Sequence, residues 1–139
     1  MKRSVMREQI FKILFRMEFN SAEEMDEQVD LFFSSGDMQV SEKDRLEIIE
    51  KTRNIYERIP TLDQMIRDHL EGWTLERVGK VELAVLRLAV YELVYDPDIP
   101  AGVAISEAVE LAGKFGDDSS NVFVNGVLSK FDEAKQAKK

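Results

Sequence analysis

The sequence predicts an all-α protein of about seven helices. Apolar residues recur three and four positions apart in successive stretches of the chain, which is the spacing of one face of an α-helix. Prolines, glycines and clusters of serine, aspartate and asparagine separate these stretches, and such residues end or cap helices. The 139 residues are enough for one compact domain, or for two small helical bundles that share an interface.

The first helix is expected over residues 4 to 19. Its apolar positions form two rows that together cover more than half of its circumference. Either several neighbours surround this helix, or part of the aromatic row faces a partner, so Phe11 and Phe15 belong either to the core or to an interface. The two rows are Met6, Ile10, Ile13, Leu14 and Met17, and Phe11, Phe15 and Phe19.

Three more helices are expected in the first half of the chain. Ser21, followed by acidic residues suited to a first turn, opens a short second helix. Ser41, with Asp44 three residues later, resembles a capping box and opens a long third helix that Pro60 is expected to end. Thr61 is expected to cap the fourth helix.

The fourth helix carries His69, the only histidine of the chain, on an apolar seam with Met65 and Trp73. This position favours a half-buried, hydrogen-bonded core histidine over a metal ligand or a proton shuttle. The chain contains no cysteine, which excludes disulfides, thiolate metal sites and cysteine nucleophiles. We therefore expect no metal and no cofactor.

A central fifth helix is expected from Arg77 to Leu93, with Thr74 as its cap. Pro97 and Pro100 lack the amide hydrogens that a continuing helix needs, so the helix must stop there. The helical spacing resumes from Val103 to Ala112 and again from Val122 to Leu128. The apolar stripe of the central helix is too wide for one neighbour to cover: Val78, Val81, Val85, Leu86, Leu88, Ala89 and Leu93.

The distribution of charge is more informative than its sum. The net charge of −8 argues against a nucleic-acid binder, because phosphate affinity comes mainly from lysine and arginine. Residues 1–20, however, carry +3, whereas residues 21–36 hold five acids and no base. The basic residues at the start of the first helix, Lys2, Arg3 and Arg7, form a basic tip and gain nothing from the helix dipole. They indicate either an anion-binding tip or an ordinary solvated surface.

The segment from Asp117 to Asn121 is rich in capping residues and opens the last helix. Its amide hydrogens are expected either to receive a phosphate or, more commonly, to be capped by Ser119 or Ser120. Residues 133–139 are expected to form a frayed, lysine-rich tail.

The sequence holds no motif of an enzyme: no Gly-rich phosphate loop, no Ser/His/Asp set with a recognisable elbow and no pair of histidines at metal spacing. No apolar run is long enough to span a bilayer, and the N-terminus lacks the apolar core of a secretory signal. These observations predict a cytoplasmic interaction module that is not an enzyme.

Several linked motifs then carry a resemblance to a known family. They are Arg7-Glu8, Val85–Leu93, Ile99-Pro100, Ile105–Ala112, Phe115-Gly116 and Phe123–Leu128. Together they resemble the NusB family of bacterial transcription antitermination proteins, nearly over the whole chain and most strongly from Trp73 to Leu128.

The resemblance implies a single domain over residues 1–139, in which two three-helix bundles share a core. The N-terminal bundle would span about residues 1–72 and the C-terminal bundle about residues 73–132. It also implies a heterodimer with NusE, a small-subunit ribosomal protein, that binds single-stranded boxA RNA of ribosomal RNA transcripts. That complex helps RNA polymerase resist termination, by binding alone and without catalysis.

Site residues follow from the resemblance position by position. The arginine-rich N-terminus of the family is matched by Lys2, Arg3 and Arg7 but not by residues 4–6, which implies fewer phosphate contacts and weaker RNA affinity. Phe123 is expected either to stack on a base or to belong to the core. The residues expected to contact RNA are Lys2, Arg3, Arg7, Lys12, Ser119, Ser120, Asn121 and Phe123, and those expected to contact NusE are Phe15 and Glu82.

Two alternatives belong to other functional classes. A NusB-like domain also forms the N-terminal part of an RNA cytosine methyltransferase, where it guides the substrate. Such an enzyme needs a following doubly wound α/β domain, and the sequence ends at Lys139. The other alternative is a homodimeric protein-interaction module, paired through the aromatic row of the first helix.

Overall fold

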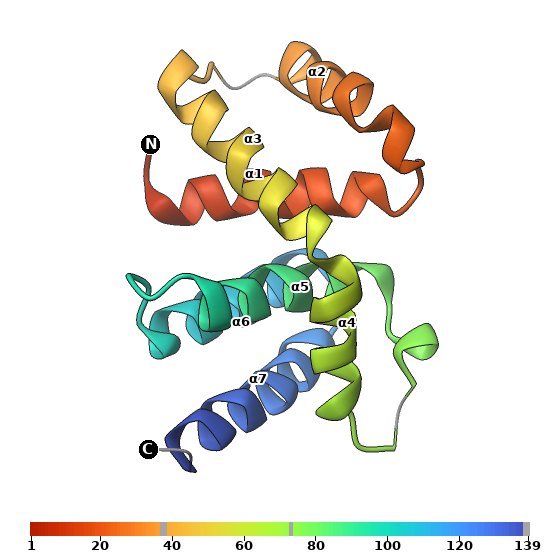
Figure 1. The fold of residues 1–139 in the computed structure, drawn as a ribbon, viewed down its shortest axis with the longest axis vertical. Helices are drawn as coiled ribbons and strands as arrows, with labels where there is room; N and C mark the ends of the chain where they lie inside the picture. Colours follow the sequence, from red (N-terminus) through yellow and green to blue (C-terminus); the bar gives the residue numbers. More distant parts are fainter. Residues whose placement is uncertain (37–38, 73, 138–139) are drawn as a thin grey trace. The chain divides into compact units, whose positions relative to one another are not determined.

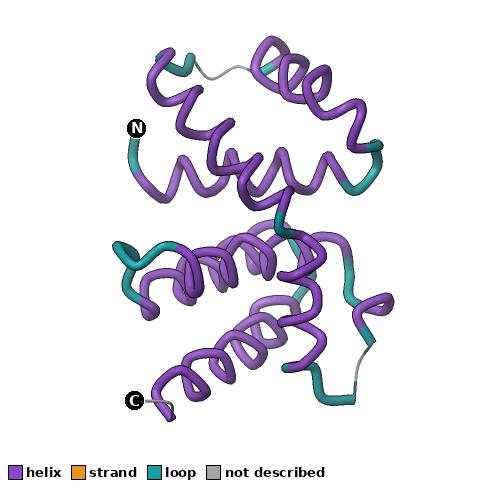
Figure 2. Tube along the Cα trace, viewed as in Figure 1, coloured by secondary structure: helices purple, strands orange, loops and turns teal. Residues whose placement is uncertain are grey.

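The computed structural model describes residues 1–36, 39–72 and 74–137, with side chains as far as Asp132. The expected all-α fold is confirmed: the described residues form seven α-helices and two short 3-10 helices, and no strand occurs among them (Figure 2). None of these helices has both the length and the apolar character needed to cross a lipid bilayer. The elements are α1 (Arg3–Met17), η1 (Ala22–Glu24), α2 (Met25–Ser35), α3 (Glu42–Glu57), α4 (Ile59–Asp68), η2 (Leu75–Arg77), α5 (Lys80–Tyr95), α6 (Ala101–Phe115) and α7 (Ser120–Ala137).

The helices group into two compact units, Met1–Glu57 and Arg58–Lys139. In the first unit α1 packs against α3 and α2, and in the second α5, α6 and α7 pack against one another while α4 packs on α5 (Figure 1). The division of a single domain into two bundles near residue 72 and the frayed tail stay predictions. Trp73, expected on the seam of the fourth helix, lies outside the described residues.

The aromatic row of α1 passes from the core to the surface. Phe11 is buried, Phe15 is half-buried and Phe19 is 61% exposed. The Phe11 and Phe15 rings stack with their centroids 6.1 Å apart, and the Phe15 and Phe19 rings meet edge to face at 5.3 Å. Phe11 is therefore a core residue, whereas Phe15 keeps part of its ring accessible.

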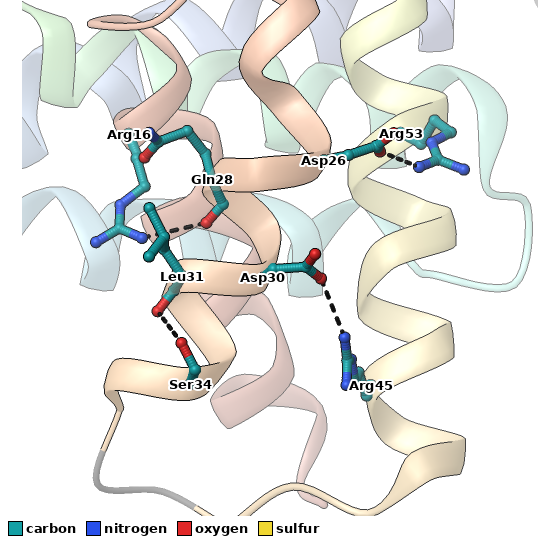
Figure 3. Close-up of polar contacts among 8 residues, drawn as sticks. All are labelled: Arg16, Asp26, Gln28, Asp30, Leu31, Ser34, Arg45 and Arg53. Carbon is teal, nitrogen blue, oxygen red and sulfur yellow. Dashed lines mark hydrogen bonds and ion pairs between the residues drawn. The ribbon is translucent and has the colours of Figure 1, made fainter.

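Helix α2 buries two side chains and makes several polar contacts with α1 and α3. Its buried side chains are Met25 and Val29. Figure 3 shows the Arg16 guanidinium donating to the Gln28 carbonyl at 3.2 Å, which links α2 to α1. Two exposed ion pairs join α2 to α3: Arg53–Asp26 at 2.9 Å and Arg45–Asp30 at 3.3 Å.

The beginnings of two helices differ from the sequence-based predictions. Pro60 does not end the third helix; it lies in the first turn of α4, where a missing amide hydrogen costs nothing. Thr61 is therefore inside α4 rather than its cap. Thr74 precedes the 3-10 turn η2 without a capping hydrogen bond, and α5 begins later, after Gly79.

His69 behaves as a core residue. Its Nδ1 lies 2.8 Å from the Met65 carbonyl oxygen, and its ring stacks on Phe131 with the centroids 3.8 Å apart. The described residues contain no group of three or more histidine, aspartate or glutamate side chains that could hold a metal ion.

Candidate nucleic-acid interface

The basic residues at the start of α1 differ in how exposed they are. Lys2 lies just before the helix and is exposed, and no acidic residue stands in the first turn. The Arg3 side chain is 78% exposed and pairs with Glu47 of α3 at 2.9 Å. Because an exposed ion pair is weak, it leaves the Arg3 guanidinium available to a phosphate.

Arg7 and Lys12 are less exposed than Lys2 and Arg3. Arg7 is only 6% exposed, so its guanidinium lies within the protein. Lys12 is half-buried and pairs with Glu8, one helical turn earlier, at 3.4 Å. The exposed part of the basic tip thus consists of Lys2 and Arg3.

A pocket of about 510 Å³ lies in the second unit, where the beginning of α5 and the beginning of α7 come together. One part of its wall comes from η2 and the first turn of α5, and the other from the turn before α7 and the first turn of that helix. The lining residues are Arg77, Val78, Gly79, Glu82, Asp117, Ser119, Ser120, Val122 and Phe123.

Ser120 is the centre of the hydrogen bonds in this pocket. Its side chain is buried, 1% exposed, and its hydroxyl donates to Glu82 Oε1 of α5. The Ser120 Oγ also accepts the backbone amide hydrogen of Asp117 at 2.9 Å and lies 3.2 Å from Asp117 Oδ1. Asp117 Oδ1 also accepts hydrogen bonds from the amide of Ser119 at 2.9 Å and from its hydroxyl at 2.8 Å.

Two glycines make room for this arrangement. A Cβ at Gly116 would lie 2.6 Å from the Ser120 Cβ and 2.7 Å from the Ala112 carbonyl oxygen. A Cβ at Gly79 would lie 3.2 Å from the Glu82 Cδ and closer still to Oε2. The glycines therefore let Ser120 and Glu82 approach the backbone closely enough to meet.

The pocket carries negative charge at neutral pH. Hydrogen bonds from the Ser119 hydroxyl and then from its backbone amide hold the pKa of the Asp117 carboxyl below its ordinary value of 3.8. Arg77, which is exposed, is the one basic residue among the described residues that line the pocket. The pocket thus presents a guanidinium, hydroxyl groups, two carboxylates and the aromatic ring of Phe123.

The structure brings together four residues that the sequence had suggested for two different partners. Ser119, Ser120 and Phe123, expected at RNA, share the pocket with Glu82, expected at NusE. Asn121 is half-buried and outside the lining, and its side-chain oxygen accepts the amide hydrogen of Val122 at 2.9 Å. Lys2, Arg3, Arg7, Lys12 and Phe15 belong to the first unit.

Five lining residues were missed by sequence reasoning: Arg77, Val78, Gly79, Asp117 and Val122. Arg77 is an isolated arginine in a turn and forms no pattern with its neighbours in sequence. Asp117 was recognised only as part of a turn. Val122 is 72% exposed at a position where helical spacing predicts a core residue, and such an exposed apolar residue beside a pocket is visible only in three dimensions.

The model of the NusB family matches residues 4–133. The chain belongs to the NusB family. The resemblance carried by the motifs is thereby confirmed, and the chain is assigned to a family of non-enzymatic transcription antitermination factors.

Individual relatives agree with the family assignment. The transcription antitermination protein NusB of Agathobacter rectalis is 47% identical over 131 residues, which cover 94% of this chain and 99% of the relative. The structure of T. maritima NusB has a TM-score of 0.80 at 35% identity and covers 94% of this chain and 89% of its own. A crystal structure of antitermination factors NusB and NusE in complex with dsRNA has a TM-score of 0.82 at 26% identity. The match covers 95% of this chain and 96% of the matched chain.

Proposed function

We propose that this NusB family member pairs with NusE, binds boxA RNA of ribosomal RNA transcripts in the cytoplasm and helps RNA polymerase resist termination. The observation that carries the proposal is the pocket between the beginnings of α5 and α7, because it combines groups suited to RNA with a carboxylate suited to a basic protein. The solved complex of NusB and NusE with dsRNA supports both partners.

The chemistry of the pocket suits a single-stranded RNA. The ring of Phe123 offers a face on which an unpaired base can stack, and such stacking contributes about 1–3 kcal/mol per base. The guanidinium of Arg77 suits a phosphate, and the hydroxyl of Ser119 suits ribose or base edges. The alternative for Phe123 is a core role, which its half-buried position also fits.

The negative charge of the chain indicates that NusE also helps to attract RNA. At a net charge of −8 the isolated chain repels RNA, whereas a basic ribosomal protein is attracted to acidic groups such as Glu82. A bound NusE would then supply the positive potential that the chain lacks. Phe15, half-buried on α1, is proposed as a second contact with NusE.

Fluorescence titration of a labelled boxA RNA, with and without saturating NusE, tests the proposal. We expect NusE to strengthen binding of boxA RNA by about 5- to 150-fold, the usual range for coupled ligands, and to strengthen binding of a scrambled RNA much less. Equal affinities for the two RNAs, together with no gain from NusE, would contradict the proposed function.

Reversing the charge of the exposed basic tip should weaken RNA binding, because fewer phosphates are neutralised. For Lys2→Glu combined with Arg3→Glu we expect the slope of log affinity against log salt concentration to become shallower by about 0.7 for each phosphate that is no longer neutralised. Lys130→Glu, at the Lys130–Glu71 pair of α7, is the control and should leave the slope unchanged. Equal slopes for the double variant and the unmodified chain would remove Lys2 and Arg3 from the interface.

Arg7 needs a different test because it is buried. Arg7→Glu would place a carboxylate at a position that is 6% exposed, where loss of folding would hide any effect on RNA. The proposed contact of Arg7 with RNA is therefore better tested by Arg7→Lys, which keeps the positive charge.

A homodimer of the free chain is a second proposal, supported by Phe19, which is 61% exposed next to the half-buried Phe15. Sedimentation of the free protein over a range of concentrations tests it, and a constant monomer mass would contradict it. The methyltransferase alternative has less support, because the relative from Agathobacter rectalis is an antitermination protein.

A further inference from the structure

The hydroxyl of Ser120 stands between two carboxylates that belong to different helical segments. Glu82 lies in the first turn of α5, and Asp117 lies in the turn before α7. Both present an oxygen to the Ser120 hydroxyl, with Asp117 Oδ1 at 3.2 Å and Glu82 Oε1 the nearer of the two. A serine has one hydroxyl hydrogen, so it donates to only one of these carboxylates at a time.

We infer that Ser120 couples the binding of the protein partner to the binding of RNA, by moving its hydrogen bond from Glu82 to Asp117. This inference rests on the proposed function. When a lysine or arginine of the partner pairs with Glu82, the carboxylate becomes a weaker acceptor for Ser120. The hydroxyl then donates to Asp117 Oδ1, which is already within hydrogen-bonding distance.

The additional hydrogen bond orders the turn that holds the RNA-facing residues. Asp117 Oδ1 already accepts two hydrogen bonds from Ser119, and the hydrogen bond from Ser120 would be the third on this same oxygen. The backbone of Ser119 in turn accepts the amide hydrogen of Phe123 at 3.1 Å, which ties the turn to the first turn of α7. A turn ordered before RNA arrives costs less entropy on binding, so RNA affinity rises.

The burial of Ser120 makes this exchange specific. At 1% exposure the hydroxyl has the two carboxylates, rather than bulk water, within reach as acceptors. Gly116 allows the close approach of Ser120 to the turn, because a side chain there would collide with it. Ser120 is thus a positioning residue: it acts on RNA through Asp117 and Ser119.

The test measures a coupling factor, defined as the ratio of boxA RNA dissociation constants without and with saturating NusE. Ser120→Ala removes the shared hydrogen, so we expect the factor to fall at least about fivefold relative to the unmodified chain. Glu82→Gln keeps the size of the side chain and an acceptor oxygen but no longer attracts a cation, so it should lower the factor as well. Ser106→Ala, at an exposed serine of α6, is the control and should leave the factor unchanged.

The outcomes separate this inference from a purely structural role and from the proposed function. If Ser120→Ala weakens RNA binding equally with and without NusE, the factor is unchanged and the inference is wrong. If the unmodified chain shows no gain from NusE at all, the proposed function fails, and the inference fails with it. Because coupling is reciprocal, NusE affinity with and without RNA must give the same factor. If Ser120→Ala does not fold, the factor of Glu82→Gln decides.

Discussion

Replacing Arg87 with alanine is expected to lower the free energy of unfolding by about 3–5 kcal/mol, because it leaves the carboxylate of Asp63 buried without its main partner. Arg87 of α5 binds Asp63 of α4 through two parallel hydrogen bonds of 2.8 and 2.9 Å. Their side chains are only 10% and 13% exposed. Urea denaturation followed by circular dichroism measures the decrease.

Two further variants show whether the burial of the Arg87–Asp63 pair causes the loss of stability. Arg67→Ala removes an exposed pair with Glu76, 3.5 Å long, and should cost less than about 1 kcal/mol. The double variant Arg87→Met with Asp63→Leu replaces the pair by apolar side chains of similar size and should be much more stable than Arg87→Ala. A double variant as unstable as the single one would show that the pair itself, rather than the unpaired charge, is needed.

Gly116→Ala is expected to lower the free energy of unfolding by about 1–3 kcal/mol and to disturb the pocket, because the added methyl group has no space. It would lie 2.6 Å from the Ser120 Cβ and 2.7 Å from the Ala112 carbonyl oxygen, and a backbone oxygen cannot rotate away. The turn before α7 must move to accept it. Denaturation measures the stability, and titration with boxA RNA in the presence of NusE reports the pocket.

Gly102→Ala is the matched control in α6. A Cβ at Gly102 would meet nothing within 4 Å, so alanine there should stabilise the chain by about 0.4–1 kcal/mol through a less flexible unfolded state. Gly116→Ala and Gly102→Ala thus have opposite expected signs. A stabilising effect of Gly116→Ala would show that the turn adapts at little cost and that Gly116 is not required for the approach of Ser120.

Helical spacing was sufficient to predict the fold class and most of the helices, because the apolar residues of each helix are close in sequence. The ends of the helices were harder to predict. Pro60 was expected to end a helix because proline lacks an amide hydrogen, yet the same property lets it occupy the first turn of α4. Deciding between the two requires knowing which neighbouring hydrogen bonds form, such as the one from the Leu62 amide to the Arg58 carbonyl at 2.8 Å.

The candidate site could be predicted only in part, because it is built by residues that are far apart in sequence. Family resemblance named Glu82 and Ser120 separately, one for each partner. Their hydrogen bond spans 38 positions, and no periodicity within a helix indicates such a contact. Nor did sequence distinguish Arg3 from Arg7, which have the same chemistry but of which only the first is exposed.

The way in which α2 is attached has a consequence for any experiment that varies ionic strength. Two solvent-exposed ion pairs, Arg53–Asp26 and Arg45–Asp30, join α2 to α3, where the Arg45 guanidinium also lies over the Phe33 ring, and Met25 and Val29 are the buried side chains of α2. Dissolved ions screen such pairs, so concentrated electrolyte loosens this helix while the apolar contacts of α1 with α3 persist. As the salt concentration rises, RNA affinity falls because counterion release becomes less favourable, and α2 detaches in part over the same range. A helicity measurement on the RNA-free protein separates the two contributions.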